Sequence, residues 1–121
     1  MKIRSTYIYT AAIMVICCVF SATLHAQDCN SGYQSALQMF QKGQYDLVPG
    51  ATVACRQDGQ AKKKNGQAID VALVTRVYKL VYESYMRIDN ISGANSALDE
   101  LGSLIGKDRE GAKSAVNAAS F

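Results

Sequence analysis

Histidine and tryptophan are almost absent from this chain of 121 residues, which has one His, His25, and no Trp. His25 falls in an N-terminal segment that we expect to be removed, so the remaining chain would carry no histidine. That excludes Ser-His-Asp and Cys-His catalysis, and also histidine as a metal ligand. The charge is also nearly balanced, with 13 Lys+Arg against 10 Asp+Glu. A strongly basic nucleic-acid binder is therefore excluded, and no nucleic-acid partner is expected.

The N-terminal segment 1–26 has the three parts of a secretory signal peptide. Lys2 and Arg4 give a positive start, residues 8–20 are almost wholly apolar, and the segment ends in the small residue Ala26. The apolar run is shorter than the about 20 residues that a membrane-spanning helix needs. Cleavage after Ala26 is therefore favoured, and a retained signal anchor is the alternative. We expect export to the periplasm or secretion, with no stable membrane span after cleavage.

Removal of this segment would leave residues 27–121, enough for one small domain. Without Lys2 and Arg4, 11 basic side chains face 10 acidic ones, a net charge of +1. Two of the four cysteines remain, Cys29 and Cys55. We divide the chain into a signal peptide (1–26), a helical-hairpin domain (27–106) and a weakly structured C-terminal tail (107–121).

Helical spacing of apolar residues dominates the domain, and signals for strands are sparse. The pattern predicts an all-α fold of two antiparallel helical hairpins. Gly43 would end the first helix, and Pro49 would lie in the first turn of the second, which Asp46 would cap. The third helix is apolar on most of its surface and should be central. The predicted helices cover residues 30–42, 46–57, 67–88 and 92–105, with a loop at 58–66.

The tail carries a weak stripe of small residues at helical spacing: Ala112, Ala115, Val116 and Ala119. Small side chains bury little apolar surface, so the stripe predicts a short helix that lies loosely on the bundle. A disordered end is the alternative.

The two remaining cysteines occupy matching places in the first predicted hairpin. Cys29 precedes Gly43 by nearly the same separation in sequence as that by which Cys55 follows it. Positions equidistant from the turn of an antiparallel hairpin face each other, so the thiols should meet at its open end. Export would supply an oxidising compartment, and a Cys29–Cys55 disulfide is predicted. An unbridged pair and a redox-active pair are the alternatives, although the spacing is unlike Cys-x-x-Cys.

Several residues resemble the tetratricopeptide repeat family. Ala36 fits the small position of its first helix, and Gly43-Gln44-Tyr45-Asp46 fits its turn. In the second hairpin, the matching residues are Tyr78, Val81, Tyr85, Ala94 and Leu98. The chain is also similar to small exported helical-hairpin proteins of Bacteroidetes-type envelopes, where a Cys before the first helix and a Gly-x-Tyr/Phe turn recur. The resemblance implies a scaffold that binds proteins or peptides without catalysis.

Two groups of residues are candidates for binding a partner. Lys62, Lys63 and Lys64 lie in the predicted loop and could contact an anionic partner such as phospholipid headgroups; a solvated loop is the alternative. Tyr45 and Tyr82 are the preferred exposed tyrosines, because tyrosine gives a large, rigid contact area in interfaces. Packing of these rings in the core is the alternative.

Acidic residues give little sign of a catalytic or metal site. Asp99 and Glu100 are adjacent on a predicted helix, so their side chains point about 100° apart and cannot flank one glycosidic bond. No calcium-loop pattern joins the other aspartates. No catalytic residue, cofactor or metal is therefore predicted.

The sequence favours a non-catalytic protein–protein interaction module of the periplasm or cell envelope. The partner would be another protein, held between the third helix and the first hairpin. Self-association is also expected to help, because repeat arrays usually need about three repeats to be stable. A small secreted effector or inhibitor is the alternative, and a small hydrolase using Asp99, Glu100 or Glu83 is a remote one.

Overall fold

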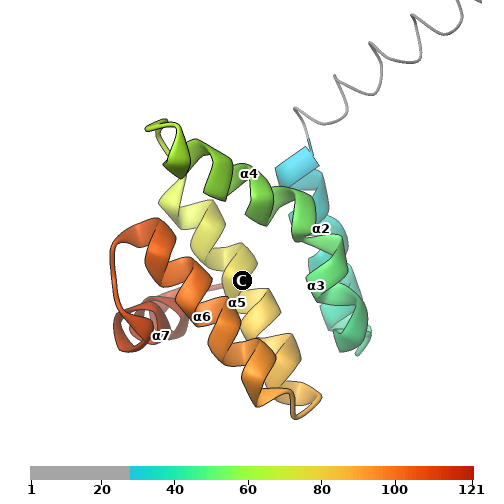
Figure 1. Cartoon of the computed structure of the whole chain (residues 1–121). Coiled ribbons are helices and arrows are strands. Elements are labelled where there is room, and N and C mark those ends of the chain that lie inside the picture. The colour runs from blue at the N-terminus through green and yellow to red at the C-terminus, as the bar shows by residue number, and fades with distance from the viewer. Residues whose placement is uncertain (1–27) are drawn as a thin grey trace, which may run out of the picture.

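The computed structural model describes residues 28–121 (Figure 1). The signal peptide predicted at 1–26 lies outside the described residues. The described chain is helical throughout and contains no strand, so the predicted all-α class is confirmed. None of its helices has the length and apolar character needed to cross a membrane. In order, the elements are α2 (Asp28–Gln41), η1 (Tyr45–Leu47), α3 (Val48–Ala51), α4 (Val53–Lys64), α5 (Val71–Arg87), α6 (Ile91–Ile105) and α7 (Arg109–Ala118).

The first hairpin pairs α2 with α3 and α4. It turns at Gly43, whose φ of 77° is in the left-handed region that glycine adopts most readily. The amide of Gln44 then donates to the carbonyl of Met39 at 2.8 Å, which satisfies a carbonyl at the end of α2. Pro49 lies at the start of α3, as predicted. Asp46 does not cap this segment, because it lies inside the 3-10 turn η1, and the predicted single helix 46–57 is divided at Thr52.

The prediction of a loop at residues 58–66 is wrong, because α4 continues to Lys64. Gly59 resembles a helix breaker in the sequence, yet it is buried where α4 contacts its neighbours. A Cβ placed on it would lie 3.6 Å from Leu104 and 3.8 Å from Val74. The residues that follow are good helix formers, and Asp58 pairs with Lys62 one turn later at 3.0 Å. Packing and local propensity together therefore extend the helix by about two turns.

Helix α5 is central and contacts every other helix of the described chain. It begins at Val71, later than residue 67, because the carboxylate of Asp70 caps it and accepts from the amide of Leu73 at 3.2 Å. Its inward side chains form the middle of a single core that draws on α2, α3, α4, α6 and α7. The fully buried large residues of α5 are Tyr78, Leu80, Val77 and Val81.

Helix α6 pairs with α5 as the second hairpin. Asn90 caps its start by accepting from the amide of Gly93 at 2.9 Å, and Gly106 ends it with a φ of 71°. The small residue Gly93 allows close approach to α5, since a Cβ there would lie 2.7 Å from the ring of Tyr85.

The C-terminal region is more ordered in its packing than predicted. Residues 109–118 form α7, with Asp108 as the cap, and Ala112 and Val116 are fully buried. The predicted helix is present, but the expectation of a weakly structured tail that lies loosely on the bundle is wrong. Its small side chains let α7 approach both α5 and α6, and this close fit compensates for the small area that each residue buries.

The disulfide between Cys29 and Cys55 joins the start of α2 to α4, with 4.4 Å between the Cα atoms. Both hairpin turns lie at the other end of the bundle, where η1 packs against α5 (Figure 1). The molecule thus has a disulfide at the open end of the first hairpin and two turns at the opposite end.

Candidate functional site

The end of the bundle that carries both turns exposes large apolar side chains. Leu47 of η1 is exposed, as are three residues around the α5–α6 turn: Met86, Ile88 and Ile91. Tyr45 lies beside them and is half-buried. We call these five residues the turn-end surface. Exposed apolar residues that gather at one end of a small protein indicate an interaction surface more often than isolated ones do.

Arg87 fixes the two halves of this surface relative to each other. Its guanidinium carbon lies 4.7 Å from the ring centroid of Phe40 and 5.3 Å from that of Tyr45. The two rings meet edge to face, with centroids 5.2 Å apart. Glu83 holds the same guanidinium from one turn earlier on α5, at 3.4 Å. Cation–π contacts of this kind join the first hairpin to α5 and limit the motion of Tyr45.

Both predicted tyrosines keep part of their surface in solvent. Tyr45 is half-buried within the turn-end surface, and Tyr82 is half-buried on α5 and packs against the core. Tyr82 lies between Lys79 and Met86 at helical spacing, so it is on the stripe of α5 that leads toward the turn-end surface.

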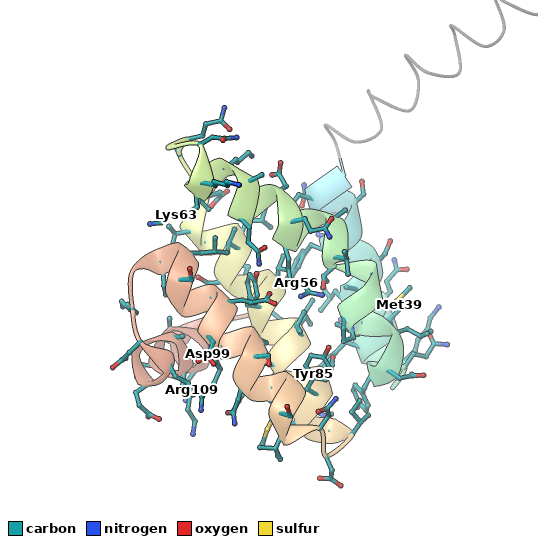
Figure 2. The ribbon with its side chains drawn as sticks, viewed as in Figure 1. Met39, Arg56, Lys63, Tyr85, Asp99 and Arg109 are labelled. Carbon is teal, nitrogen blue, oxygen red and sulfur yellow. A yellow bond between two sulfur atoms is a disulfide. The ribbon has the colours of Figure 1, made fainter. Side chains whose placement is uncertain are left out.

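The three lysines do not join the tyrosines. Lys62, Lys63 and Lys64 form the last turn of α4, at the opposite end of α5 from Tyr45. A helix of 17 residues such as α5 is about 25 Å long, and Figure 2 shows Lys63 and Tyr85 toward opposite ends of the bundle. Lys62 is paired with Asp58, whereas Lys63 and Lys64 are exposed. The predicted partner-binding residues therefore do not form one surface.

A polar network that the sequence did not reveal links the two hairpins. Arg56 of α4 donates to the carbonyl of Pro49 at 2.9 Å, to the hydroxyl of Thr52 at 3.2 Å and to Glu100 of α6 at 3.3 Å. The hydroxyl of Tyr78, on α5, donates to the same carboxylate oxygen at 3.1 Å. The side chain of Arg56 is only 16% exposed and points toward α5 and α6 (Figure 2).

The environment of Tyr78 favours its neutral form. Burial raises the pKa of Tyr78 above its ordinary value, and the negative charge of Glu100 and the hydrogen bond to it raise that pKa further. The phenol thus acts here as a hydrogen-bond donor. The network is a structural connection between α4, α5 and α6, and every member of it has a partner.

The adjacent carboxylates of α6 diverge, as predicted. Asp99 faces α7, where its two oxygens accept from Nε and a terminal nitrogen of Arg109 at 2.9 and 2.8 Å (Figure 2). That contact holds the pKa of the Asp99 carboxyl below its usual range. Glu100 instead faces Arg56. Among residues 28–121, no group of three or more His, Cys, Asp or Glu side chains could hold a metal ion.

A second aromatic contact was also absent from the sequence-based predictions. Phe121 packs against Phe40 with tilted rings whose centroids are 5.2 Å apart, and Nζ of Lys79 lies 4.9 Å from the centroid of the Phe121 ring. The sequence assigns Phe40 to the core stripe of its helix and Phe121 to the tail. Only the course of the chain after α7 brings them together. The only sequence signal was a large aromatic residue after a stripe of alanines.

Comparison with known proteins adds no relative: the chain matches no protein-family model, no curated protein and no solved structure.

Proposed function

We propose that this protein is a non-catalytic interaction module that binds another protein through the turn-end surface. The observation that carries the proposal is the exposure of Leu47, Met86, Ile88 and Ile91 around two neighbouring turns. Burial of apolar surface is the main favourable term in protein association. The tyrosine at the edge of the surface adds a side chain that is common in binding hot spots.

The contacts that hold the turn-end surface in place support the proposal. The turns are held by the core, by the Arg87 contacts and by the caps at Gly43 and Asn90. Little conformational entropy would be lost when a partner binds, and preorganisation of this kind raises affinity. Paired helical hairpins that present their turns are also consistent with the resemblance to tetratricopeptide repeats.

The proposal places the protein in the periplasm, at the envelope or outside the cell. The residue pattern of segment 1–26 and the Cys29–Cys55 disulfide support export, because disulfides persist in oxidising compartments. The partner is a folded protein with an apolar patch of its own. A partner in the envelope fits a resident module, whereas a foreign protein captured outside the cell fits an effector or inhibitor.

Site-specific photocrosslinking in intact producing cells tests the proposal. A photoreactive amino acid at Ile91 should trap a discrete protein, because this residue is one of the exposed apolar side chains at the α5–α6 turn. Position 71 is a matched control. Val71 and Ile91 are each the first residue of a helix, follow a capping side chain and are 52% exposed, but they lie at opposite ends of the bundle.

A further substitution tests whether the crosslinked protein binds through the turn-end surface. Ile88→Glu should abolish the adduct formed from position 91, while Val71→Glu should leave it unchanged. Both residues are exposed, so neither substitution should unfold the chain, and circular dichroism checks this. Equal labelling from positions 71 and 91, or an adduct that survives Ile88→Glu, would reject the turn-end surface as the binding site.

A further inference from the structure

The chain changes direction and conformation immediately after α7. Ala119 is extended, with φ of −76° and ψ of 147°, and residues 119–121 run away from the helix end. The carbonyl of Ala119 accepts a hydrogen bond from Nζ of Lys79 on α5. Two residues later, the ring of Phe121 reaches Phe40 on α2. A short extended segment therefore crosses from α7 to α5 and the first hairpin, and the C label of Figure 1 coincides with α5 in this view.

Two contacts hold the aromatic ring of this segment. Its centroid lies 5.2 Å from that of Phe40, with the planes inclined at 39°, and Lys79 places its ammonium 4.9 Å from the ring centroid. Phe40 itself is kept in place by Arg87 at 4.7 Å and by Tyr45. The Phe40–Arg87 part of the receiving surface is thus built by residues of α2 and α5 independently of the segment that it receives, and Lys79 of α5 contacts the segment directly. We call Phe40, Lys79 and Arg87 the aromatic site.

We propose that the aromatic site is a peptide-binding site for an extended segment that carries an aromatic side chain, and that Phe121 fills it in cis. Lys79 binds two features of the segment: it donates a hydrogen bond to the carbonyl of Ala119, and its ammonium group contacts the aromatic face of Phe121 two residues later. An aliphatic side chain would lose the attraction of the ring for the ammonium group and the ring–ring contact with Phe40. The site is therefore selective for aromatic residues.

Phe121 is suited to reversible occupancy because it remains 49% exposed. A half-exposed ring gives up little burial when it leaves, so a partner segment can take its place. Phe121 also competes with any partner segment, because the short chain that joins it to α7 gives it an effective concentration in the millimolar range. Binding in trans should be weak while Phe121 is present and stronger when its ring is removed. The aromatic site contains none of the five residues of the turn-end surface, although Phe40 and Arg87 contact Tyr45, and the inference does not depend on that surface having a partner.

Peptide titration of the purified chain tests the site. The probe is an acetylated peptide with the sequence of residues 117–121 in which tryptophan replaces the phenylalanine. The protein has no Trp, so probe fluorescence reports binding directly. The probe should bind the Phe121→Ala chain about tenfold more tightly than the unaltered chain, because the competing ring is gone.

Matched variants show whether the aromatic site is responsible. In the Phe121→Ala background, Lys79→Met keeps an unbranched side chain, one heavy atom shorter, but removes its charge, and it should reduce affinity about fivefold or more. Lys113→Met, which alters an exposed lysine of α7, should have no effect. The unlabelled phenylalanine peptide should displace the probe, and a leucine version should do so at a concentration about tenfold higher.

Three results would overturn the inference. The first is equal probe affinity for the unaltered and Phe121→Ala chains. The second is equal affinity for the Lys79→Met and Lys113→Met variants. The third is equal competition by the leucine and phenylalanine peptides, which would indicate a general apolar contact. Circular dichroism of each variant confirms that the helices are intact, and the photocrosslinking at position 91 can succeed or fail independently of all three.

Discussion

Tyr78 donates a hydrogen bond to Glu100 at a position where only 1% of its surface reaches solvent. Its folded-state pKa lies above the value of about 10 that an unfolded tyrosine has. The folded chain therefore keeps the phenolic proton under conditions in which the unfolded chain loses it. The stabilisation is fully present below a pH of about 10 and declines as the pH rises above that value.

We predict that Tyr78→Phe makes the free energy of unfolding less dependent on pH above 10. At neutral pH the substitution should lower stability by about 1.5–3 kcal/mol, since it removes one hydrogen bond to a charged acceptor. Above pH 10 the difference should shrink, because the unaltered protein loses up to about 1.4 kcal/mol per pH unit from this group. Urea unfolding at a series of pH values measures both effects.

Tyr82→Phe is the control for this comparison. Tyr82 lies one turn later on α5, and its ring is outside the network of Thr52, Arg56, Tyr78 and Glu100. Its replacement leaves the hydrogen bond from Tyr78 to Glu100 in place, so the contribution of Tyr78 to the slope above pH 10 should be retained. If Tyr78→Phe and Tyr82→Phe give the same slope, burial beside Glu100 does not control the ionisation of Tyr78.

At the scale of single elements, the sequence predicted α6 best, because both of its ends are determined locally, although the local cap of α5 at Asp70 was missed. Helix α6 nearly matches its predicted range because Asn90 and Gly106 act as caps through nearby backbone groups. Helix α4 was predicted too short because Gly59 is a helix breaker only when it is exposed. Its contact with Leu104, far along the chain on α6, is a tertiary feature that no local pattern contains.

Gly102 has a similar tertiary role in the packing of α6. The chain turns back over it after α6, and the amide of Lys107 donates to the carbonyl of Gly102 at 2.9 Å. A Cβ on Gly102 would overlap the carbonyl oxygen of Lys107 and lie 3.3 Å from that of Asp108. Both neighbours are backbone atoms, so relief of the overlap would have to move the start of α7.

We therefore predict that Gly102→Ala destabilises the protein by about 2–3 kcal/mol, as overpacking of a buried position does. Gly50→Ala is the control, because Gly50 is also helical but an added methyl group there would have no atom within 4 Å. That change should be neutral or stabilise by up to about 1 kcal/mol through higher helix propensity. Thermal unfolding of the two variants measures the contrast, and equal melting temperatures would contradict it.

At the scale of the whole molecule, the sequence predicted the all-α class, the central position of α5 and the pairing of the cysteines. The sequence also predicted that Tyr45 is exposed. It did not predict the turn-end surface, because that surface forms only when the fold brings the two turns together. The aromatic site required more, because Phe40, Lys79 and Phe121 come from three separate segments. Charge and spacing gave no sign of the Arg56 network, whose members come from different helices.

The disulfide acts on the whole molecule because it restricts the unfolded chain. The bridge closes a loop with a sequence separation of 26, which corresponds to about 3.5 kcal/mol of stabilisation in the chain-entropy treatment. We predict that replacing Cys29 and Cys55 together by alanine lowers the free energy of unfolding by about 2–4 kcal/mol. Reduction of the unaltered protein should give a loss of similar size, and the double variant should be insensitive to reductant.

Urea unfolding with and without reductant, combined with a thiol count on the unfolded chain, checks this prediction. Because residues 28–121 carry two cysteines, a chain that lacks segment 1–26 should show no free thiol before reduction and two after it. Two free thiols before reduction would show that the bridge does not form. If the bridge is intact but its reduction does not change the urea midpoint, the prediction is wrong. The disulfide would then not stabilise the folded chain, and the core alone would hold α2 against α4.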